Sequence, residues 1–386
     1  MKKILKKILE RELAFLATSV LKKFRPFIIG VTGSSGKTTT KYMIGELLKS
    51  VRGKTSASFS NLNTETGLPM AVLGYKLVPK GYFDFLKMAI CAPFRTLFLS
   101  SYDDFLVLEY ATDRPGDMDA LVKIARPDIA VITNFGVAHI EKFGTTEKIA
   151  VEKWKLALSA KSAVVTTQSV LKKTESLDQP RVKVQTTGNI ATVLAKNIKI
   201  LTNRTSFDLY LDEKKYETEF SYLGEHNIEN LELAVLAVYI TTGETGKIVQ
   251  KIKDLKPRIG RGSRLVGRRD ILILDESYNA NPHSMLAALR VLGDMSFGRK
   301  VAILGGMAEI APIAKKSHHE IAEVAKKVAD LTIGVGDGFR EEKLDKWYQD
   351  VEELNKEIES ILRKGDTVLI KGSHSVGLRE TVERLK

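Results

Sequence analysis

Residues 30–40 read Gly30-Val-Thr-Gly-Ser-Ser-Gly-Lys-Thr-Thr-Thr40. An apolar segment at 27–29 precedes this run, and the spacing predicts an amphipathic helix at 42–48 after it. A strand, a glycine-rich loop and a helix in this order favour a phosphate cradle, because glycines let backbone N–H groups approach phosphate oxygens at the positive end of the helix. An ordinary Gly/Ser turn ahead of a helix is the alternative.

The predicted phosphate loop consists of Gly33, Ser34, Ser35, Gly36, Lys37, Thr38 and Thr39. Lys37 is placed to reach the outer phosphates of a nucleotide, and the Thr38 hydroxyl is placed to bind Mg²⁺. The loop departs from the full G-x-x-x-x-G-K-[ST] pattern, since Val31 stands where the first glycine is expected.

Composition limits the class of protein. The chain has 386 residues, which predicts two domains, and its formal net charge is +13. Such a charge fits nucleic acid, an anionic membrane or anionic substrates. The charge is spread along the chain without a zinc-finger, RRM or KH signature, so we expect no nucleic-acid partner. One cysteine, Cys91, fits a reducing cytosol, and no apolar run reaches the roughly 20 residues that span a bilayer.

Two segments leave a membrane question open. Residues 1–24 form a basic amphipathic helix by their apolar spacing, which either packs on the protein or lies on a membrane. Residues 82–101 are the most apolar part of the chain, and they form either a core helix or a membrane- or substrate-contacting surface. We therefore expect a cytoplasmic protein, with peripheral contact at the inner membrane face as the open alternative.

Strand and helix patterns alternate along the chain, which predicts an α/β fold with a mainly parallel sheet. An antiparallel patch is expected at 185–222, a helix at 228–241 and a linker at 253–262. We predict three parts: a basic amphipathic helix at 1–26, a P-loop central ATPase domain at 27–255, and a smaller Rossmann-like α/β domain at 256–386.

Three further residues are candidates for a metal and phosphate site. Glu109 ends a predicted strand at 105–110, and His139 follows a predicted strand at 129–133 by a short loop. Ligands of open α/β sheets bind at the carboxyl ends of strands, and Mg²⁺ prefers oxygen ligands. Lys153 lies on a predicted helix at 147–160, where periodicity alone indicates a solvated lysine.

From residue 27 onward the chain resembles the Mur ligases, ATP-dependent amide ligases of cell-wall precursor synthesis, and it is most similar to the MurF type. The resemblance is carried by a series of motifs in the family's order: Gly33-Ser-Ser-Gly-Lys-Thr-Thr39, Asn61-Leu-Asn-Thr-Glu-Thr-Gly-Leu-Pro69, Leu108-Glu-Tyr-Ala-Thr-Asp-Arg-Pro-Gly116, Gly224-Glu-His-Asn-Ile-Glu-Asn230, Asp275-Glu-Ser-Tyr-Asn-Ala-Asn-Pro282, Leu304-Gly-Gly-Met-Ala-Glu-Ile310 and Ile370-Lys-Gly-Ser-His374. The family's phosphate loop also lacks the first glycine, which accounts for Val31.

Asn134 to His139, followed by Glu147 to Leu156, resembles the family's Asn…His…Lys region. The resemblance implies two Mg²⁺ ions, one bound by Thr38 and Glu109 and the other by His139 and a carbamylated lysine at Lys153, with Lys155 as the alternative position. It further implies nucleotide contacts from Asn227, Asn230, Asp275 and Glu276, with Asn227 also a possible helix cap. Arg261 would reach the γ-phosphate when the domains close, and Lys37, His139, Lys153 and Arg261 form the catalytic set. Expected substrate contacts come from Asn61, Asn63, Tyr278, Asn279 and Asn281.

The implied reaction activates a muramyl-peptide carboxylate as an acyl phosphate with ATP and joins it to D-alanyl-D-alanine. MurF-type ligases carry an N-terminal domain that binds the uridine diphosphate end of the substrate, whereas the phosphate loop of this chain begins near residue 30. We expect that domain to be absent, and to be replaced by the N-terminal helix, by residues 82–101 or by a partner. The alternatives are a related ligase with a different or lipid-linked acceptor and a non-catalytic nucleotide-binding partner of the cell-wall machinery.

Overall fold

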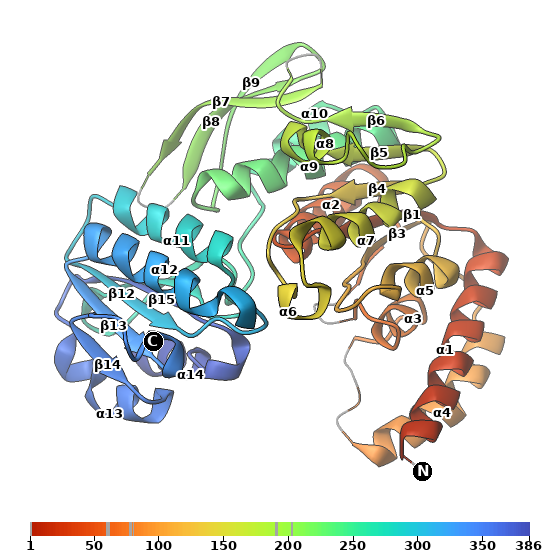
Figure 1. Cartoon of the computed structure of the whole chain (residues 1–386). Coiled ribbons are helices and arrows are strands. Elements are labelled where there is room, and N and C mark those ends of the chain that lie inside the picture. Colours follow the sequence, from red (N-terminus) through yellow and green to blue (C-terminus); the bar gives the residue numbers. More distant parts are fainter. Residues whose placement is uncertain (1, 59–61, 77–78, 80, 190–191, 202–203) are drawn as a thin grey trace.

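The computed structural model describes residues 2–58, 62–76, 79, 81–189, 192–201 and 204–386. Figure 1 shows two lobes that meet along one side, with a pair of helices, α1 (Lys2–Phe24) and α4 (Tyr82–Leu97), at the edge of the first lobe. Each lobe is built on a six-stranded sheet, and a three-stranded sheet adjoins the first lobe. The α/β fold class is therefore confirmed.

The first sheet has the order β2-β3-β1-β4-β5-β6, and all its strand pairs are parallel. Its strands are β1 (Phe27–Thr32), β2 (Thr55–Ala57), β3 (Phe105–Glu109), β4 (Ile129–Ile132), β5 (Ala163–Thr166) and β6 (Lys183–Thr186). Alternate residues of β1 enter two different cores, with Ile28 on the side of α1 and Ile29 on the side of α2. Both faces are thus covered, which explains the continuous apolar runs that marked these strands in the sequence.

The helices of this lobe follow the strands in βα order. They are α2 (Lys37–Arg52), α3 (Gly67–Val72), α5 (Asp117–Ile124), α6 (Ile140–Phe143), α7 (Thr146–Ser159) and α8 (Gln168–Lys173), in addition to α1 and α4. The sequence placed the second helix at 42–48, but α2 begins five residues earlier at Lys37. The run of threonines at 38–40 hid this first turn, because β-branched residues favour strands over helices.

The expected antiparallel patch is an antiparallel three-stranded sheet of β7 (Val193–Ile200), β8 (Thr205–Leu211) and β9 (Lys214–Phe220). It packs on α9 (Glu225–Thr242), which also packs on α2, and α10 (Gly246–Ile252) follows. Gly243 ends α9 in the left-handed conformation with φ of 70°, as its position in the sequence predicted.

The second lobe has the sheet order β10-β11-β15-β12-β13-β14, in which only β10 is antiparallel to its neighbour. Its elements are β10 (Ser263–Val266), β11 (Leu272–Glu276), α11 (Pro282–Asp294), β12 (Lys300–Gly305), α12 (Ala314–Val328), β13 (Leu331–Val335), β14 (Lys346–Tyr348), α13 (Val351–Ile361), β15 (Thr367–Lys371) and α14 (Arg379–Leu385), with short 3-10 turns η1 (Arg268–Asp270), η2 (Ala311–Ile313), η3 (Asp337–Phe339) and η4 (His374–Val376). The short edge strands β2, β6, β10 and β14 were not predicted, since their three or four residues include few apolar side chains, unlike the equally short but wholly apolar β4.

The two lobes share an apolar core cluster. Ile140 and Phe143 of α6 belong to the same core cluster as Met285 and Leu289 of α11. This cluster brings the loop after β4 close to the second sheet, which positions the site described below.

The helix at the N-terminus packs on the protein, as one of the two sequence interpretations predicted. Leu13, Ala17 and Val20 are buried in the same core as Met88 and Ala92 of α4. The outer sides of both helices expose large apolar side chains. Within the described ranges, no helix has both the length and the apolar character needed to cross a membrane.

Candidate functional site

The glycine-rich loop lies between β1 and α2, at the carboxyl end of the first sheet. Gly36 precedes α2 with φ of 79°, and a Cβ atom there would lie 2.3 Å from Asn230 Oδ1. A Cβ atom at Gly33 would lie 1.9 Å from Thr133 Oγ1. Only glycine fits at these two positions, because any side chain would collide with neighbouring elements.

The loop after β4 supports the glycine-rich loop through hydrogen bonds. The Ser35 N–H donates to Asn134 Oδ1 at 3.0 Å, and the Thr133 hydroxyl donates to the Ser35 carbonyl oxygen at 2.6 Å. The Ser34 N–H donates to the Asn134 carbonyl oxygen at 3.0 Å. These contacts fix the shape of the loop before any ligand arrives.

Lys37 opens α2 and bends back over the loop. Its Nζ donates to the Gly33 carbonyl oxygen at 2.7 Å. Burial lowers the pKa of Lys37, while the nearby Glu109 carboxylate opposes that shift. Lys37 also lines the cavity beside the loop. Anionic oxygens that enter the cavity would compensate the hydration that its ammonium group has lost.

Glu109, the last residue of β3, is a buried carboxylate with three donors. Oε2 accepts from Thr38 Oγ1 at 2.9 Å and from Lys41 Nζ at 3.0 Å, and Oε1 accepts from Asn63 Nδ2 at 3.0 Å. Burial by itself raises the pKa of Glu109, but Lys41 and Lys37 outweigh it and hold the pKa down to about 2. The carboxylate is therefore ionised at neutral pH.

The donor set around Glu109 fits a magnesium ion bound together with phosphates. The Thr38 hydroxyl and the Glu109 carboxylate are adjacent oxygen donors on the cavity wall. Among the described residues, no three His, Cys, Asp or Glu side chains gather closely enough to hold a metal ion on their own. Mg²⁺ in phosphate-transfer sites is usually held by one or two carboxylates and completed by phosphate oxygens and water, so the residues fit that kind of ion.

His139 lies at the contact between the two lobes. It precedes α6 in the left-handed conformation, with φ of 62°. Its Nδ1 atom is 2.8 Å from Oε2 of Glu309, in the loop after β12, and 3.4 Å from Oδ1 of Asp113, but neither contact has the alignment of a hydrogen bond. His139 lowers the pKa of Glu309. The candidate metal ligand thus meets a carboxylate from the opposite lobe.

Lys153 and Lys155 differ in environment. Lys153 is buried on α7, and its Nζ donates to Thr112 Oγ1 at 3.1 Å. Burial, assisted by the charge of Lys37, lowers the pKa of Lys153 to about 7. Lys155 instead forms ion pairs with Asp119 at 2.7 Å and with Glu152 at 2.8 Å. Of the two lysines, only Lys153 has a large neutral fraction at neutral pH.

Asn227 and Asn230 extend from the first two turns of α9 to the cavity. The suggested capping role of Asn227 is wrong: α9 begins at Glu225, and the Asn227 side chain donates to the Leu223 carbonyl oxygen at 2.9 Å. Asn230 Oδ1 accepts from the Thr40 hydroxyl at 3.1 Å, so it also ties α9 to α2.

The second lobe contributes Arg261 and Tyr278 to the cavity. The Arg261 guanidinium carbon lies 3.8 Å from the centroid of the Tyr278 ring, and that ring stacks on His374 with centroids 6.1 Å apart. A guanidinium over an aromatic face is held by the ring quadrupole. This contact keeps Arg261 directed from the second lobe toward the first.

Glu276, Asn279 and Asn281 line the cavity around a buried lysine. Lys371 Nζ donates to the Asn279 carbonyl oxygen at 3.0 Å and lies 3.4 Å from Glu276 Oε2. Burial lowers the pKa of Lys371. Asn281 caps α11 by accepting from the Ser284 N–H at 2.9 Å, which gives it a structural task besides any contact with substrate.

Asp275 lies behind the cavity wall rather than on it. It is fully buried, and its carboxylate accepts from the Gly260 N–H at 2.9 Å, from Ser277 Oγ at 2.6 Å and from Arg379 at 3.0 Å. A direct ribose contact would require these donors to give way. We therefore correct the expected contact: Asp275 holds the segments that carry Arg261 and Tyr278, and the exposed part of the motif begins at Glu276.

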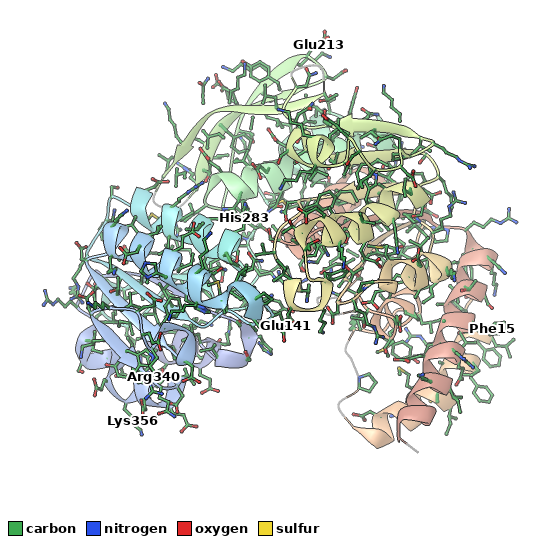
Figure 2. All side chains as sticks on the ribbon, in the orientation of Figure 1. Phe15, Glu141, Glu213, His283, Arg340 and Lys356 are labelled. Atoms are coloured by element: carbon green, nitrogen blue, oxygen red, sulfur yellow. The ribbon has the colours of Figure 1, made fainter. Side chains whose placement is uncertain are left out.

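One cavity of ≈ 300 Å³ joins these residues across the two lobes. The sequence-predicted residues that line it are Ser34, Ser35, Gly36, Lys37, Thr38, Thr39, Asn63, Glu109, His139, Asn227, Asn230, Arg261, Glu276, Tyr278, Asn279 and Asn281. Gly33, Lys153 and Asp275 do not line it, and Asn61 lies outside the described residues. Figure 2 shows His283, another lining residue, on the side of α11 that faces the first lobe.

Sequence reasoning missed several contributors. Lys41 pairs with Glu109 from one turn beyond Lys37, and the spacing i, i+4 on α2 was the available signal. Glu309 and Lys371 lie in motifs that were recognised without roles for these side chains. Asn134 likewise opens a recognised motif that assigned it no contact with the glycine-rich loop, and Thr133 carried no local signal for its contact with that loop.

Two protein-family models match the chain. The Mur ligase middle domain matches residues 31–81 and 89–238, and the Mur ligase glutamate ligase domain matches residues 260–374. Among curated relatives, a UDP-N-acetylmuramoyl-tripeptide–D-alanyl-D-alanine ligase of Treponema pallidum is 31% identical over 95% of this chain and 76% of its own length. The Escherichia coli protein of the same name is 27% identical over 98% of this chain and 81% of its own.

Solved structures agree with the sequence comparison. A MurF ligase from Thermotoga maritima in complex with ADP superimposes with a TM-score of 0.80 at 28% identity, covering 97% of this chain and 83% of the other. A MurF from Acinetobacter baumannii shares the fold with a TM-score of 0.81. Because the middle-domain description alone matches more than half of the chain, this protein belongs to the Mur ligase family, alongside its MurF-type members.

Proposed function

We propose that this chain is an ATP-dependent, ADP-forming amide ligase of peptidoglycan precursor synthesis, which joins a muramyl-tripeptide carboxylate to D-alanyl-D-alanine. The observation that carries the proposal is the shared cavity, in which a phosphate loop from the first lobe faces Arg261 and Tyr278 from the second. The curated relatives that match nearly the whole chain bear the name of this activity.

In the proposed site the ATP phosphates bind at the glycine-rich loop, where the backbone N–H groups and Lys37 neutralise their charge. Asn227 and Asn230 contact the base from α9, and Glu276 contacts the ribose from the second lobe. Arg261 approaches the γ-phosphate across the cavity, since its contact with Tyr278 directs it there. Asn63, Tyr278, Asn279 and Asn281 then remain to position the acceptor and the incoming dipeptide.

The proposed chemistry has two steps. The substrate carboxylate attacks the γ-phosphorus, the bond to the bridging oxygen breaks, and ADP leaves with that electron pair. The amine of D-alanyl-D-alanine next attacks the acyl carbon, loses its proton and expels phosphate, which leaves an amide. Catalysis consists mostly of positioning and charge neutralisation, so the cationic side chains around the cavity would contribute chiefly by neutralising the phosphate charge.

Two magnesium ions are part of the proposal, one at Thr38 and Glu109 and one near His139 and Lys153. Bound Mg²⁺ would supply charge neutralisation for the phosphates. Glu109 suits this task because its depressed pKa keeps it anionic. His139 offers a ring nitrogen from the loop after β4, beside Asp113 and Glu309.

Lys153 is proposed to carry a carbamate. Carbamate formation requires the neutral amine to attack CO₂, and a pKa of about 7 supplies that form at neutral pH. The product is an anionic oxygen donor in place of a cation, which reverses the local electrostatics next to a metal ion. Thr112, whose hydroxyl contacts Lys153 Nζ, would hold the modified side chain in place.

We propose domain limits at 1–26, 27–255 and 256–386, with the second and third parts closing over ATP. Peripheral contact with a membrane through residues 1–24 and 82–101 also belongs to the proposal. The motifs of this chain account for the nucleotide and the reacting end of the substrate. A partner that contributes to recognition of the uridine end also belongs to the proposal.

The test supplies ATP, Mg²⁺ and D-alanyl-D-alanine with either a UDP-linked or a lipid-linked muramyl tripeptide. The expected result is one ADP, one phosphate and one dipeptide-extended product for each turnover, identified by mass. ADP release that continues without the dipeptide, with no amide product from either acceptor, would overturn the proposal. The two acceptors also separate the MurF reaction from that of a ligase for lipid-linked substrates.

A further inference from the structure

The outer sides of α1 and α4 form an exposed apolar surface, which we call the apolar face. It consists of Ile8, Phe15, Ile90, Phe94, Leu97 and Phe98. The exposed fractions are 71% for Phe15, 61% for Phe94, 73% for Leu97 and 78% for Phe98. Figure 2 shows Phe15 pointing away from the body of the molecule. Half of the large apolar side chains that the described residues expose therefore lie on these two helices or, for Phe98, directly after the end of α4.

The two helices pack tightly on the protein through their inner sides, so poor packing does not explain why the side chains of the apolar face are exposed. Leu9, Leu13 and Ala17 of α1 and Met88 and Ala92 of α4 are buried in one core. Each helix thus carries apolar side chains on two sides, one packed against the protein and one exposed to solvent. Contiguous exposed apolar surface on a folded protein marks an interaction site.

A second feature, which we call the basic pocket, lies at the end of α1. It is a cavity of ≈ 420 Å³ whose lining includes the cations Lys22, Arg25, Lys123, Arg126 and Lys161. Its one acidic lining residue, Asp128, already pairs with Lys161 at 3.2 Å. Apolar side chains such as Leu21, Phe27 and Ile124 complete the wall. The lining therefore combines a surplus of positive charge with an apolar floor.

The last turn of α1 connects the two features. Lys22 lines the basic pocket, while its neighbour Lys23 donates from Nζ to the Leu99 carbonyl oxygen at 2.8 Å, just beyond the apolar face on α4. Phe24 stacks on Tyr102, with ring centroids 5.6 Å apart. These contacts hold the end of α4 beside the pocket.

Charge indicates the occupant of this surface. The first 25 residues contain eight basic and two acidic side chains, and the whole chain carries +13. An apolar surface bordered by cations matches an anionic lipid bilayer, whose phosphates attract lysine and arginine while its acyl boundary accepts aromatic and aliphatic side chains. A second copy of this chain would bring the same positive charge and would be repelled.

We propose that the apolar face and the basic pocket together dock this protein on an anionic membrane, with a lipid phosphate held in the basic pocket. The inference deepens the peripheral contact proposed above and names its partner. Phe94, Leu97 and Phe98 enter the headgroup region, and Lys22 and Lys123 hold phosphate beside them. The nucleotide cavity lies at the opposite, carboxyl end of β1 and remains free to turn over.

The test is sedimentation with vesicles of phosphatidylcholine alone or mixed with phosphatidylglycerol, using the full chain. Binding is expected to require phosphatidylglycerol and to weaken as salt is raised. The triple variant Phe94→Glu, Leu97→Glu, Phe98→Glu is expected to lose about tenfold or more in partitioning. Val266→Glu, at an equally exposed apolar position of the second lobe, is the control for one such exchange away from α1 and α4, with Phe98→Glu as its single counterpart, and Val266→Glu is expected to bind like the unaltered chain.

A second pair of variants tests the basic pocket. Lys22→Gln with Lys123→Gln is expected to weaken binding by about fivefold for each lysine, the equivalent of about 1 kcal/mol per charge near an anionic surface. Lys247→Gln with Lys343→Gln removes the same charge elsewhere and is expected to have a smaller effect. Free inorganic phosphate at millimolar concentration distinguishes the sources of the anion, since a lipid site keeps its vesicle binding under that competition.

Three outcomes would overturn the proposal: equal binding to both vesicle types, unchanged binding of the triple variant, or a dimer in light scattering that the triple variant converts to a monomer. Thermal unfolding of every variant verifies that the fold is retained. Vesicle binding is measured without any ligase assay, so its failure leaves the proposed ligase function standing, and the reverse also holds.

Discussion

The nucleotide cavity and the surface formed by α1 and α4 both gather lysines and arginines, but they place them in different surroundings. In the cavity, burial lowers the pKa of Lys37, Lys41 and Lys371, and each lies near a carboxylate. At the membrane-docking surface, Lys22 and Lys23 are exposed beside apolar side chains. In the cavity, loss of hydration thus shifts the pKa of lysine side chains. At the surface, hydrated lysines keep their charge and can attract an anionic partner over a distance.

The largest effect is expected at the phosphate loop. Lys37→Ala removes the cation that neutralises the outer phosphates, and ATP turnover is expected to fall about 10³-fold, the order found when one preorganised donor is removed from a transition state. Lys49→Ala, on the exposed side of the same helix, is the control and is expected to leave turnover nearly unchanged. A well-folded Lys37→Ala protein with normal turnover would remove the phosphate-loop assignment.

Lys153 tests whether burial, rather than position on α7, makes a lysine functional. Lys153→Ala is expected to lower turnover about 10²-fold. Lys155→Ala breaks ion pairs with the exposed Asp119 and the buried Glu152, neither of which lines the cavity, and is expected to have little effect on turnover. Because the pKa of Lys153 is about 7, its neutral fraction grows as pH rises from 6 to 8, and carbamate formation should grow with it. Carbon-13 NMR with labelled bicarbonate measures the carbamate directly, and its absence from the unaltered protein throughout this range would exclude the modification.

A smaller effect is expected at the contact between the lobes. Glu309→Ala removes the carboxylate beside His139 and is expected to lower metal affinity about tenfold, the scale of partners that orient a metal ligand. Glu309→Gln keeps an acceptor there and is expected to retain more of that affinity. Titration with Mn²⁺ followed by electron paramagnetic resonance gives the affinity, and equal values for both variants and the unaltered chain would show that Glu309 does not position His139.

The smallest effect is expected when the apolar face is altered and ATP turnover is measured, which tests whether the two regions act independently. The triple variant at Phe94, Leu97 and Phe98 is expected to keep ATP turnover on a soluble acceptor within about twofold, because distant sites without shared partners act independently. A large loss with soluble substrates would mean that the apolar face takes part in acceptor binding. The separation between the two regions would then fail.

Pattern-based reasoning succeeded where the signal is local. The glycine-rich loop between a strand and a helix, the strand ending at Glu109 and the left-handed Gly243 are all visible in short stretches of sequence. It was wrong about the start of α2, because threonine preferences pointed away from a helix that the glycine-rich loop and α9 hold in place. It also predicted a direct nucleotide contact for Asp275, which the fold buries behind the cavity wall.

The sequence by itself determined the α/β fold class, the phosphate loop and the order of the motifs that relate this chain to the Mur ligases, since each depends on residues adjacent along the chain. Only the tertiary structure decided which lysine of α7 is desolvated, which carboxylate faces His139 and which sides of α1 and α4 stay exposed. Those properties depend on burial and on contacts between segments that lie far apart along the chain, from 41 residues between Thr112 and Lys153 to 76 residues between Lys23 and Leu99 and further still between His139 and Glu309. A short stretch of sequence does not show which charges and apolar groups from distant segments will surround one side chain, and these determine its pKa and exposure.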